Sequence, residues 1–317
     1  MKELSQFAAD VLDGLLSSPK SLSSKYFYDD EGSRLFREIM NLPEYYLTNC
    51  ESEILNKHSD EIRDDLINGH DGIDIVELGA GDGIKTALLI ESLLLSGVDI
   101  TYSPIDISQE AVDTLSNAFA ARFPGLRVNS LVGDYFEVLA SLSADKERRK
   151  VILFLGSNIG NICGERAVEF FRGLHNSMNT DDLLFVGFDL QKDPDTILRA
   201  YDDSAGITAR FNMNLLTRMN RELGADFDLK KFTHFANYDP IEGSARSYLI
   251  SREKQSVEVK ELGRTFEFDQ WEPMFMEISQ KYSINMIEDL AARGNFSVKR
   301  NYFDSRIYFC DSLWQMR

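Results

Sequence analysis

Several short apolar runs, each followed by a more polar segment, lie in the middle of the chain. The runs cover residues 73–78, 100–106, 126–132, 151–155 and 183–190, and residues 84–94 carry the clearest helical pattern between them. Continuous apolar strands that alternate with helices are typical of a parallel sheet with helices on both faces. The pattern therefore predicts an α/β fold built on a mostly parallel sheet.

The C-terminal end of the chain departs from this pattern. Residues 285–293 have helical periodicity, and residues 296–310 are predicted to form two strands joined near Asp304. A nicotinamide-binding fold would continue with parallel units, whereas an antiparallel final pair is typical of the methyltransferase sheet that binds S-adenosylmethionine (SAM). The predicted hairpin therefore favours SAM over a nicotinamide cofactor.

Two long segments lie outside the predicted sheet, and a chain of 317 residues is long enough for two domains. One precedes the first strand, and the other, rich in aromatic and amide residues, separates the fifth strand from the hairpin. We expect residues 56–191 and 281–317 to form the cofactor domain. We expect residues 1–55 and 192–280 to form a discontinuous substrate-binding domain.

Net charge and composition limit the kinds of partner that the protein is expected to bind. The chain has 34 Lys and Arg against 52 Asp and Glu, a formal net charge of −18, so a phosphate backbone would be repelled and no nucleic acid is expected. No apolar stretch approaches the roughly 20 residues of a membrane span, and the N-terminus lacks the pattern of a secretory signal. We expect a cytoplasmic monomer without membrane contact. The 3 cysteines and 4 histidines lack the spacing of metal ligands, so no metal is expected.

A glycine-rich turn follows the first predicted strand. Gly79, Gly81 and Gly83 stand between residues 73–78 and the helical pattern of residues 84–94. Glycine lets a backbone turn sharply and approach a ligand closely, and the free N–H groups of the helix start attract negative charge. Taken alone, such a turn also fits a tight strand-to-helix connection. An acid at the end of the second strand, Asp106, strengthens the interpretation as a cofactor site, because it is placed to bind ribose hydroxyls.

Nine ordered motifs along nearly the whole chain resemble those of the SAM-dependent histidine Nα-methyltransferases of ergothioneine biosynthesis. The motifs are PKSL (19–22), KYFYD (25–29), GSRLF (32–36), LPEYY (42–46), ELGAG (77–81), FLGSNIGN (154–161), RAYDD (199–203), NRELGADFD (220–228) and EIS (277–279). The resemblance implies a class I SAM methyltransferase fold, with a Rossmann-like seven-stranded sheet and an antiparallel C-terminal hairpin. The wider superfamily includes a fungal indole-amino-acid N-methyltransferase.

The resemblance also implies which residues bind the cofactor. Gly79, Ala80 and Lys85 would hold the methionine part of SAM, and Asp106 would hold the ribose. The same site includes Gly81, Gly133 and, beside the adenine, Asp134. Lys85 also suits this role on chemical grounds, because a cation near a helix N-terminus can pair with a carboxylate. A solvated lysine in the first helical turn is the alternative. The product would be S-adenosylhomocysteine.

For the amino-acid substrate, the resemblance places Tyr45, Asn161 and Tyr201 around the α-amino and α-carboxylate groups. Tyr28 would face the amine, so Tyr28 and Asn161 are the expected catalytic residues. Tyrosine hydroxyls and an amide can donate to a carboxylate, and the amide oxygen can accept from an amine. Without the resemblance, each tyrosine would be interpreted as a packing residue.

Glu277 and Ser279 would hold the side-chain ring of the substrate. They are two residues apart, so on an extended segment their side chains point to the same face. A carboxylate and a hydroxyl suit the two nitrogens of an imidazole. Without the resemblance, Glu277 is one of many surface acids.

One position departs from the family pattern. Ser247 aligns with a methionine that lies near the substrate ring in the family, so the wall of the ring pocket is smaller and more polar here. The preferred function is trimethylation of L-histidine to hercynine, the first step of ergothioneine biosynthesis. Nα-methylation of another aromatic amino acid, such as tryptophan, is the alternative enzyme activity, and a SAM- or amino-acid-binding protein without turnover is the third hypothesis.

Overall fold

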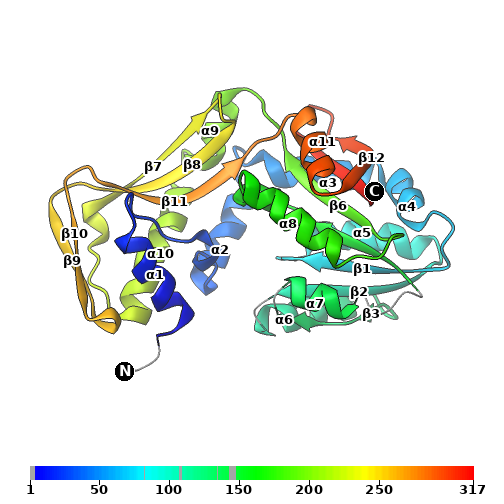
Figure 1. Ribbon diagram of the computed structural model, residues 1–317, viewed down its shortest axis with the longest axis horizontal. Coiled ribbons are helices and arrows are strands. Elements are labelled where there is room, and N and C mark those ends of the chain that lie inside the picture. Colours follow the sequence, from blue (N-terminus) through cyan, green and yellow to red (C-terminus); the bar gives the residue numbers. More distant parts are fainter. Residues whose placement is uncertain (1–3, 82, 107–108, 134, 143–147) are drawn as a thin grey trace. The chain divides into compact units, whose positions relative to one another are not determined.

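The computed structural model describes residues 4–81, 83–106, 109–133, 135–142 and 148–317 (Figure 1). The backbone forms two compact units, each made from two stretches of the chain. Unit 1 comprises Met1–Tyr46 and Lys192–Gln280, and unit 2 comprises Leu47–Gln191 and Lys281–Arg317.

Helix α3 (Tyr46–Lys57) explains why the first unit ends at Tyr46 and not at the expected residue 55. Two of its side chains, those of Cys50 and Glu51, contact other residues of unit 2. Glu51 accepts a hydrogen bond of 2.7 Å from the backbone N–H of Gly156, and Cys50 Sγ lies 3.2 Å from a guanidinium nitrogen of Arg306. These long-range contacts leave no local pattern in the sequence, and the first stretch of unit 1 ends at Tyr46 where residue 55 was expected.

Unit 2 contains a central sheet. Its elements after α3 are α4 (Ser59–Ile67), β1 (Gly72–Leu78), α5 (Ile84–Leu95), β2 (Asp99–Asp106), α6 (Gln109–Arg122), β3 (Arg127–Val128), β4 (Leu131–Val132), α7 (Tyr135–Leu142), β5 (Arg149–Phe154), the 3₁₀ helix η2 (Asn158–Asn161), α8 (Glu165–Asn176), β6 (Leu183–Asp189), α11 (Ile284–Arg293), β12 (Phe296–Phe303) and β13 (Phe309–Met316). In the described part of the chain the sheet has eight strands, ordered β12-β13-β6-β5-β1-β2-β3, with β4 also paired to β2.

The sheet confirms the predicted α/β class. Strands β6, β5, β1 and β2 run parallel, whereas β13 pairs antiparallel with both β6 and β12. Strands β3 and β4 both pair with β2 and together occupy the edge position where one continuous strand was expected. The final strand extends to Met316, beyond the expected end at residue 310.

The strands bury side chains on both faces. Val76, Leu78 and Ile152 belong to an apolar cluster with helices α7, α8 and α11 (Figure 1). Alternation along the strands turns the neighbouring side chains to the opposite face. There Tyr102 of β2 stacks on Phe119 of α6, with ring centroids 4.6 Å apart.

The chain leaves unit 2 after β6 and returns before α11 at paired positions. Leu190 and Tyr282 form a parallel bridge, and the N–H of Tyr282 bonds to the carbonyl of Asp189 at 2.9 Å. Beside this bridge, the fully buried Lys281 and Asp189 form an ion pair of 2.7 Å. Backbone pairing and an ion pair therefore join the two ends of the insertion.

Unit 1 is built from helices and antiparallel strands. Its elements are α1 (Gln6–Leu16), η1 (Ser24–Tyr26), α2 (Asp30–Met40), α9 (Pro194–Tyr201), α10 (Ile207–Leu223), η3 (Leu229–Lys231), β7 (Phe232–Asp239), β8 (Ser244–Ser251), β9 (Gln255–Val259), η4 (Lys260–Leu262), β10 (Arg264–Phe268) and β11 (Pro273–Gln280). Strands β11, β8 and β7 form one sheet, and β10 and β9 form a separate hairpin.

The core of unit 1 joins these elements. Phe27, Phe211 and Leu249 are buried in one apolar cluster with residues of α1, α2, β9 and β10. Helix α10 begins where Asp203 accepts the backbone N–H groups of Ile207 and Thr208, at 2.9 and 2.7 Å. A carboxylate is a favoured partner for the free N–H groups of a helix start. Among the described residues of both units, no helix is long and apolar enough to cross a membrane.

Candidate functional site

The glycine turn after β1 has the backbone conformation that only glycine adopts readily. Gly79, Gly81 and Gly83 have φ values of +69°, +57° and +68°, and Gly83 is the N-cap of α5. The N–H of Gly83 closes the turn on the carbonyl of Ala80 at 3.0 Å. A side chain in the left-handed region is strained, so this sequence is needed for the turn.

Two glycines at the carboxyl edge of the sheet leave space that a Cβ would fill. A Cβ on Gly79 would lie 3.1 Å from the Tyr135 hydroxyl, and one on Gly156, just after β5, would lie 3.1 Å from Lys85 Nζ. The turn after β1 and the turn after β5 therefore carry polar side chains close to bare backbone. This edge is where open α/β sheets bind ligands.

Lys85 lies in the first turn of α5, as expected, but it has a protein partner. Its ammonium donates a hydrogen bond to Glu51, which is fully buried. Burial acts most strongly and opposes the charged form, but the charge and hydrogen bond of Glu51 together with the charges of Asp311 and Glu77 raise the pKa of Lys85. An ammonium has three donors, so the pairing leaves donors for a ligand carboxylate.

The acid of the ELGAG motif is part of the fold beneath the turn. Glu77 is buried and accepts hydrogen bonds from the hydroxyls of Thr86 and, at 2.6 Å, of Tyr102. Burial raises the pKa of Glu77 to about 7, although both hydroxyls act in the opposite direction. Glu77 thereby ties β1 to α5 and β2.

The other predicted cofactor residues lie at the same edge. Asp106 is the last residue of β2, and its carbonyl accepts the N–H of Gly133, which follows β4, at 3.1 Å. Gly133 has a φ of +150°. Asp134 lies outside the described residues. The structure thus brings together Gly79, Ala80, Gly81, Lys85, Asp106 and Gly133 on consecutive turns of one sheet edge.

The predicted substrate residues lie in unit 1, apart from Asn161. Tyr28 and Tyr45 both contact the ring of Phe36, with centroids 5.4 and 6.2 Å apart. Phe211 of α10 packs on Tyr28 at 5.6 Å and on Phe36 at 5.8 Å. Asn161 is the last residue of η2 in unit 2, where its side chain is exposed.

Tyr28 has an electrostatic environment that keeps its hydroxyl protonated. Desolvation raises its pKa although 47% of the residue as a whole is exposed, and the nearby Glu277 carboxylate and Tyr201 hydroxyl raise it further. Tyr201 ends helix α9 and is buried. These influences bring three of the predicted substrate residues into one electrostatic neighbourhood.

The predicted ring-binding residues share one face of the three-stranded sheet. Glu277 of β11 lies directly opposite Ser247 of β8, and Ser279 lies opposite Ala245. Directly opposite residues on antiparallel strands are side-chain neighbours on the same face. Ser247 is 1% exposed, and within the described structure its hydroxyl has no hydrogen-bond partner. The strand geometry thus confirms the shared face of Glu277 and Ser279 and adds Ser247 to it.

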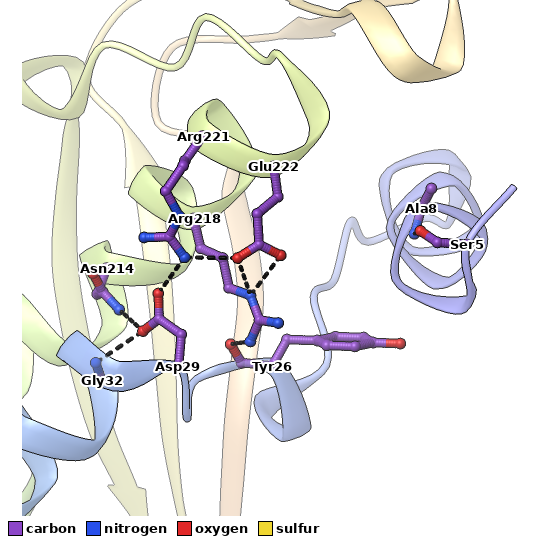
Figure 2. A network of polar contacts seen from close by, with 9 residues as sticks. All are labelled: Ser5, Ala8, Tyr26, Asp29, Gly32, Asn214, Arg218, Arg221 and Glu222. Carbon is purple, nitrogen blue, oxygen red and sulfur yellow. Dashed lines mark hydrogen bonds and ion pairs between the residues drawn. The ribbon is translucent and has the colours of Figure 1, made fainter. Parts of the chain in front are cut away.

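A polar network holds the segment that carries Tyr28 (Figure 2). Asp29 accepts hydrogen bonds from the N–H of Gly32 at 2.9 Å and from the side chains of Asn214 and Arg221 at 2.7 Å each. Arg218 donates to the carbonyl of Tyr26 at 3.0 Å. Partial burial acts to raise the pKa of Asp29, but the hydrogen bonds from Arg221, Gly32 and Asn214 and the charge of Arg221 lower it. Helix α10 therefore holds the backbone on both sides of Tyr28.

Several residues at these sites were missed by the sequence analysis. Tyr135 lies beside Gly79, and Phe36 contacts the ring of Tyr28. Asn214 donates to Asp29, the residue after Tyr28, and Glu51 pairs with Lys85. Phe36 lay in the GSRLF motif and could have been found there. Glu51 had no signal, because its role depends on a contact with a residue 34 positions away.

The chain is similar to known proteins along nearly its whole length. The sequence model of a family described as histidine-specific, SAM-dependent methyltransferases matches residues 7–316. A histidine N-alpha-methyltransferase from Mycolicibacterium smegmatis is 38% identical over 286 residues, which cover 90% of this chain and 87% of the relative. Ergothioneine biosynthesis protein 1 from Schizosaccharomyces pombe is 30% identical over 289 residues, which cover 89% of this chain and 37% of that protein.

A solved structure supports the fold. The mitomycin 7-O-methyltransferase MmcR superposes with a TM-score of 0.51 at 11% identity, covering 99% of this chain and 69% of that chain. At this identity the similarity shows the fold alone.

Proposed function

Since the chain belongs to the family of histidine-specific, SAM-dependent methyltransferases, we propose that it methylates the α-amino nitrogen of L-histidine, and that it carries the reaction to the trimethylated product, hercynine. The family match over residues 7–316 carries this proposal. The juxtaposition of Glu277, Ser279 and Ser247 on one sheet face supports the choice of an imidazole substrate.

The residues at the sheet edge fit SAM. Gly79 and Gly156 leave the backbone bare where a Cβ would meet Tyr135 and Lys85, and Lys85 offers a cation for the methionine carboxylate. Asp106, at the end of β2, would hold the ribose hydroxyls, with Gly133 beside it. When bound, SAM supplies a methyl group on a sulfonium, which is electrophilic without help from a protein nucleophile. The protein therefore has to bind, align and exclude water.

Tyr28 is proposed to act on the substrate amine as a neutral phenol. Because its pKa is raised by burial and by Glu277 and Tyr201, the hydroxyl stays protonated at neutral pH. A neutral phenol can accept a hydrogen bond from an amine N–H while donating its own proton elsewhere. It orients the lone pair of the amine and leaves removal of the ammonium proton to water. Tyr45, Tyr201 and Asn161 would bind the α-carboxylate and the remaining N–H groups.

The substrate ring is proposed to bind on the polar part of the sheet face. Glu277 accepts from one ring N–H, and Ser279 bonds to the other ring nitrogen. The buried Ser247 hydroxyl, without a partner in the described structure, adds a third polar group at the directly opposite position. A buried hydroxyl without a partner destabilises the free protein, so a polar ring substrate would be favoured there over an indole.

The aromatic rings around Tyr28 support a product with a permanent positive charge. Tyr28, Phe36 and Tyr45 lie in consecutive edge contacts, and Tyr28 is 47% exposed within its cluster. Aromatic faces attract quaternary ammonium groups by about 0.5–2 kcal/mol. This attraction grows in relative importance as methylation removes the N–H groups, so trimethylation needs no additional carboxylate.

The direct test is product analysis by mass spectrometry. The purified protein is incubated with SAM and one amino acid at a time, and S-adenosylhomocysteine and the methylated amino acids are measured. We expect histidine to gain up to three methyl groups, with tryptophan and tyrosine as matched comparisons. Faster turnover of tryptophan would favour the alternative substrate. Tight SAM binding without S-adenosylhomocysteine formation from any amino acid would favour a binding protein.

A further inference from the structure

Unit 2 buries more carboxyl groups beside Lys85 than that lysine can neutralise. Glu51 of α3 and Asp311 of β13 are both 0% exposed, and Glu77 of β1 is 4% exposed. The negative charges of all three act to raise the pKa of Lys85. Glu77 has two hydroxyl donors of its own, and Glu51 also has two donors, so among the described residues Asp311 is the acid whose charge is left without compensation.

Glu51 uses both of its oxygens. One accepts from Lys85, and the other accepts from the backbone N–H of Gly156 at 2.7 Å. Asp311 differs, because neither of its carboxyl oxygens receives a hydrogen bond from any described residue. A buried carboxylate without donors is strongly unfavourable, and such a group neutralises by keeping its proton.

The neighbour that can receive this proton is Glu51. Gly187 of β6, which pairs with Asp311, shows how close the two acids lie, because a Cβ there would be 2.4 Å from Glu51 Oε1 and 3.2 Å from Asp311 Oδ1. A side chain at residue 187 would therefore enter the space beside both carboxyl groups, which glycine leaves open. Burial and the charge of Glu51 raise the pKa of Asp311 well above its usual range, while Lys85 opposes the shift.

The other titratable groups near this site do not change the net charge around Lys85. Asp189, on the same face of β6, is neutralised by Lys281 at 2.7 Å. Cys310, the neighbour of Asp311 along β13, has its side chain in the apolar cluster on the opposite face. The local charge therefore depends on Glu51, Asp311, Lys85 and the more distant Glu77.

We propose that Glu51 and Asp311 share one proton, and that this carboxyl pair positions Lys85 for the carboxylate of SAM. The inference rests on the proposed role of Lys85. With one shared proton, the pair carries one negative charge and the group with Lys85 is neutral. If Asp311 ionises, the group gains a negative charge that repels the incoming carboxylate and competes for the ammonium of Lys85. Glu51 and Asp311 are thus positioning residues that act through Lys85.

Isothermal titration calorimetry from pH 5 to pH 9 tests the proposal with the wild-type protein, Asp311→Asn and the control Cys310→Ala. Asparagine keeps the shape of a protonated aspartate without its titration. We expect the wild-type dissociation constant for SAM to rise with pH by up to tenfold per unit, the limit for one linked proton. We expect a smaller slope for Asp311→Asn and an unchanged slope for Cys310→Ala, because Glu77 and the ligand amine still titrate in all three proteins. The α-amino group of SAM titrates near pH 8 in all three proteins, so the difference between them isolates Asp311.

Decarboxylated SAM is the matched ligand, because it lacks the group that Lys85 would hold. Its affinity should show the same pH dependence in the wild type and in Asp311→Asn. If the affinity for SAM changes with pH equally in the wild type and in Asp311→Asn, the proposal of a shared proton is wrong. If Asp311→Asn fails to fold, the wild type alone decides. Titrations at about pH 6, where the amino groups of both ligands are protonated, in two buffers of different ionisation enthalpy should show proton uptake with SAM beyond that with decarboxylated SAM, and equal uptake would overturn the proposal.

A third variant separates this inference from the proposed function. Lys85→Met should weaken SAM binding at least tenfold and leave the affinity for decarboxylated SAM unchanged. Equal affinity of Lys85→Met and the wild type for SAM would remove the basis of the carboxyl-pair inference. It would not affect the histidine assignment, which the product assay tests separately.

Discussion

Arg221 donates a hydrogen bond of 2.7 Å to Asp29 across 192 residues of sequence. The two residues belong to separate sequence motifs, and the contact explains why both motifs matter to one site. Figure 2 shows the contact between Arg221 and Asp29. Because Asp29 directly follows Tyr28, this ion pair holds the backbone beside Tyr28.

We expect Arg221→Met to change the product distribution more than the stability. Arg221 is 52% exposed, so loss of its ion pair should lower the free energy of unfolding by less than about 1 kcal/mol. A less firmly held Tyr28 should leave more monomethyl and dimethyl product, measured by mass spectrometry at limited turnover. Arg210→Met is the matched control, because Arg210 lies on the same helix and pairs with Glu38 at 3.2 Å. Identical product ratios for both variants would contradict the positioning role.

Tyr28→Phe removes the hydroxyl and keeps the ring contacts with Phe36 and Phe211. We expect the balance of methylation steps to change while SAM affinity stays the same, because the hydroxyl is proposed to orient the amine and not the cofactor. Tyr26→Phe is the control on the same segment, since its hydroxyl bonds to Asp10 at 2.8 Å. Equal losses of SAM affinity and of methylation would rule out the proposed role.

Glu277→Gln should lower kcat/KM for histidine by about ten- to a hundredfold, the usual effect of losing a hydrogen bond to a charged group. In the variant, a neutral amide oxygen replaces the charged carboxylate as the acceptor for the ring N–H. Activity with tryptophan should fall less, because an indole makes less use of that carboxylate. Glu267→Gln, on the exposed side of β10, is the control and should retain both activities. Parallel losses with histidine and tryptophan would contradict ring recognition by Glu277.

Glu77 predicts a specific pH dependence of stability. Its pKa of about 7 lies above the ordinary value for glutamate, so the folded state binds this proton more tightly than the unfolded state. The Glu77 contribution is therefore fully present below about pH 4.5 and declines as pH rises to about 7, by on the order of 3 kcal/mol.

Urea denaturation of the wild type and Glu77→Gln at pH 5 and pH 7.5 measures this contribution. The fluorescence of Trp314, which is fully buried in unit 2, reports on the relevant unit. We expect the variant to gain stability relative to the wild type as pH rises. A constant difference between the two proteins would show that Glu77 does not titrate in this range.

The sheet was predictable because its strands carry strong local patterns. Residues 73–78 and 183–190 were expected as strands, and β1 and β6 occupy nearly the same residues. The C-terminal hairpin was also expected, but the second strand continues to Met316 because Trp314 and its neighbours pair with β6. The break between β3 and β4 was missed, since short edge strands leave little pattern.

The sites were only partly predictable. Glycines at positive φ and acids at strand ends have local signals, so Gly79 and Asp106 were found without the fold. The resemblance supplied Tyr28 and Glu277, which the residues alone did not single out. Glu51 and Asp311 were missed because their chemistry depends on a contact between residues from opposite ends of unit 2.

The bridge between Leu190 and Tyr282 has a consequence for the engineering of this chain. An insertion whose two ends start from hydrogen-bonded neighbours does not disturb the strand order around it, and β13 keeps its register against β6 whatever lies between. Residues 192–280 can therefore be remodelled without breaking the pairing of β6 and β13. Because Tyr28 and Tyr45 lie in the N-terminal stretch of unit 1, a graft intended to change the acceptor has to exchange both stretches of that unit.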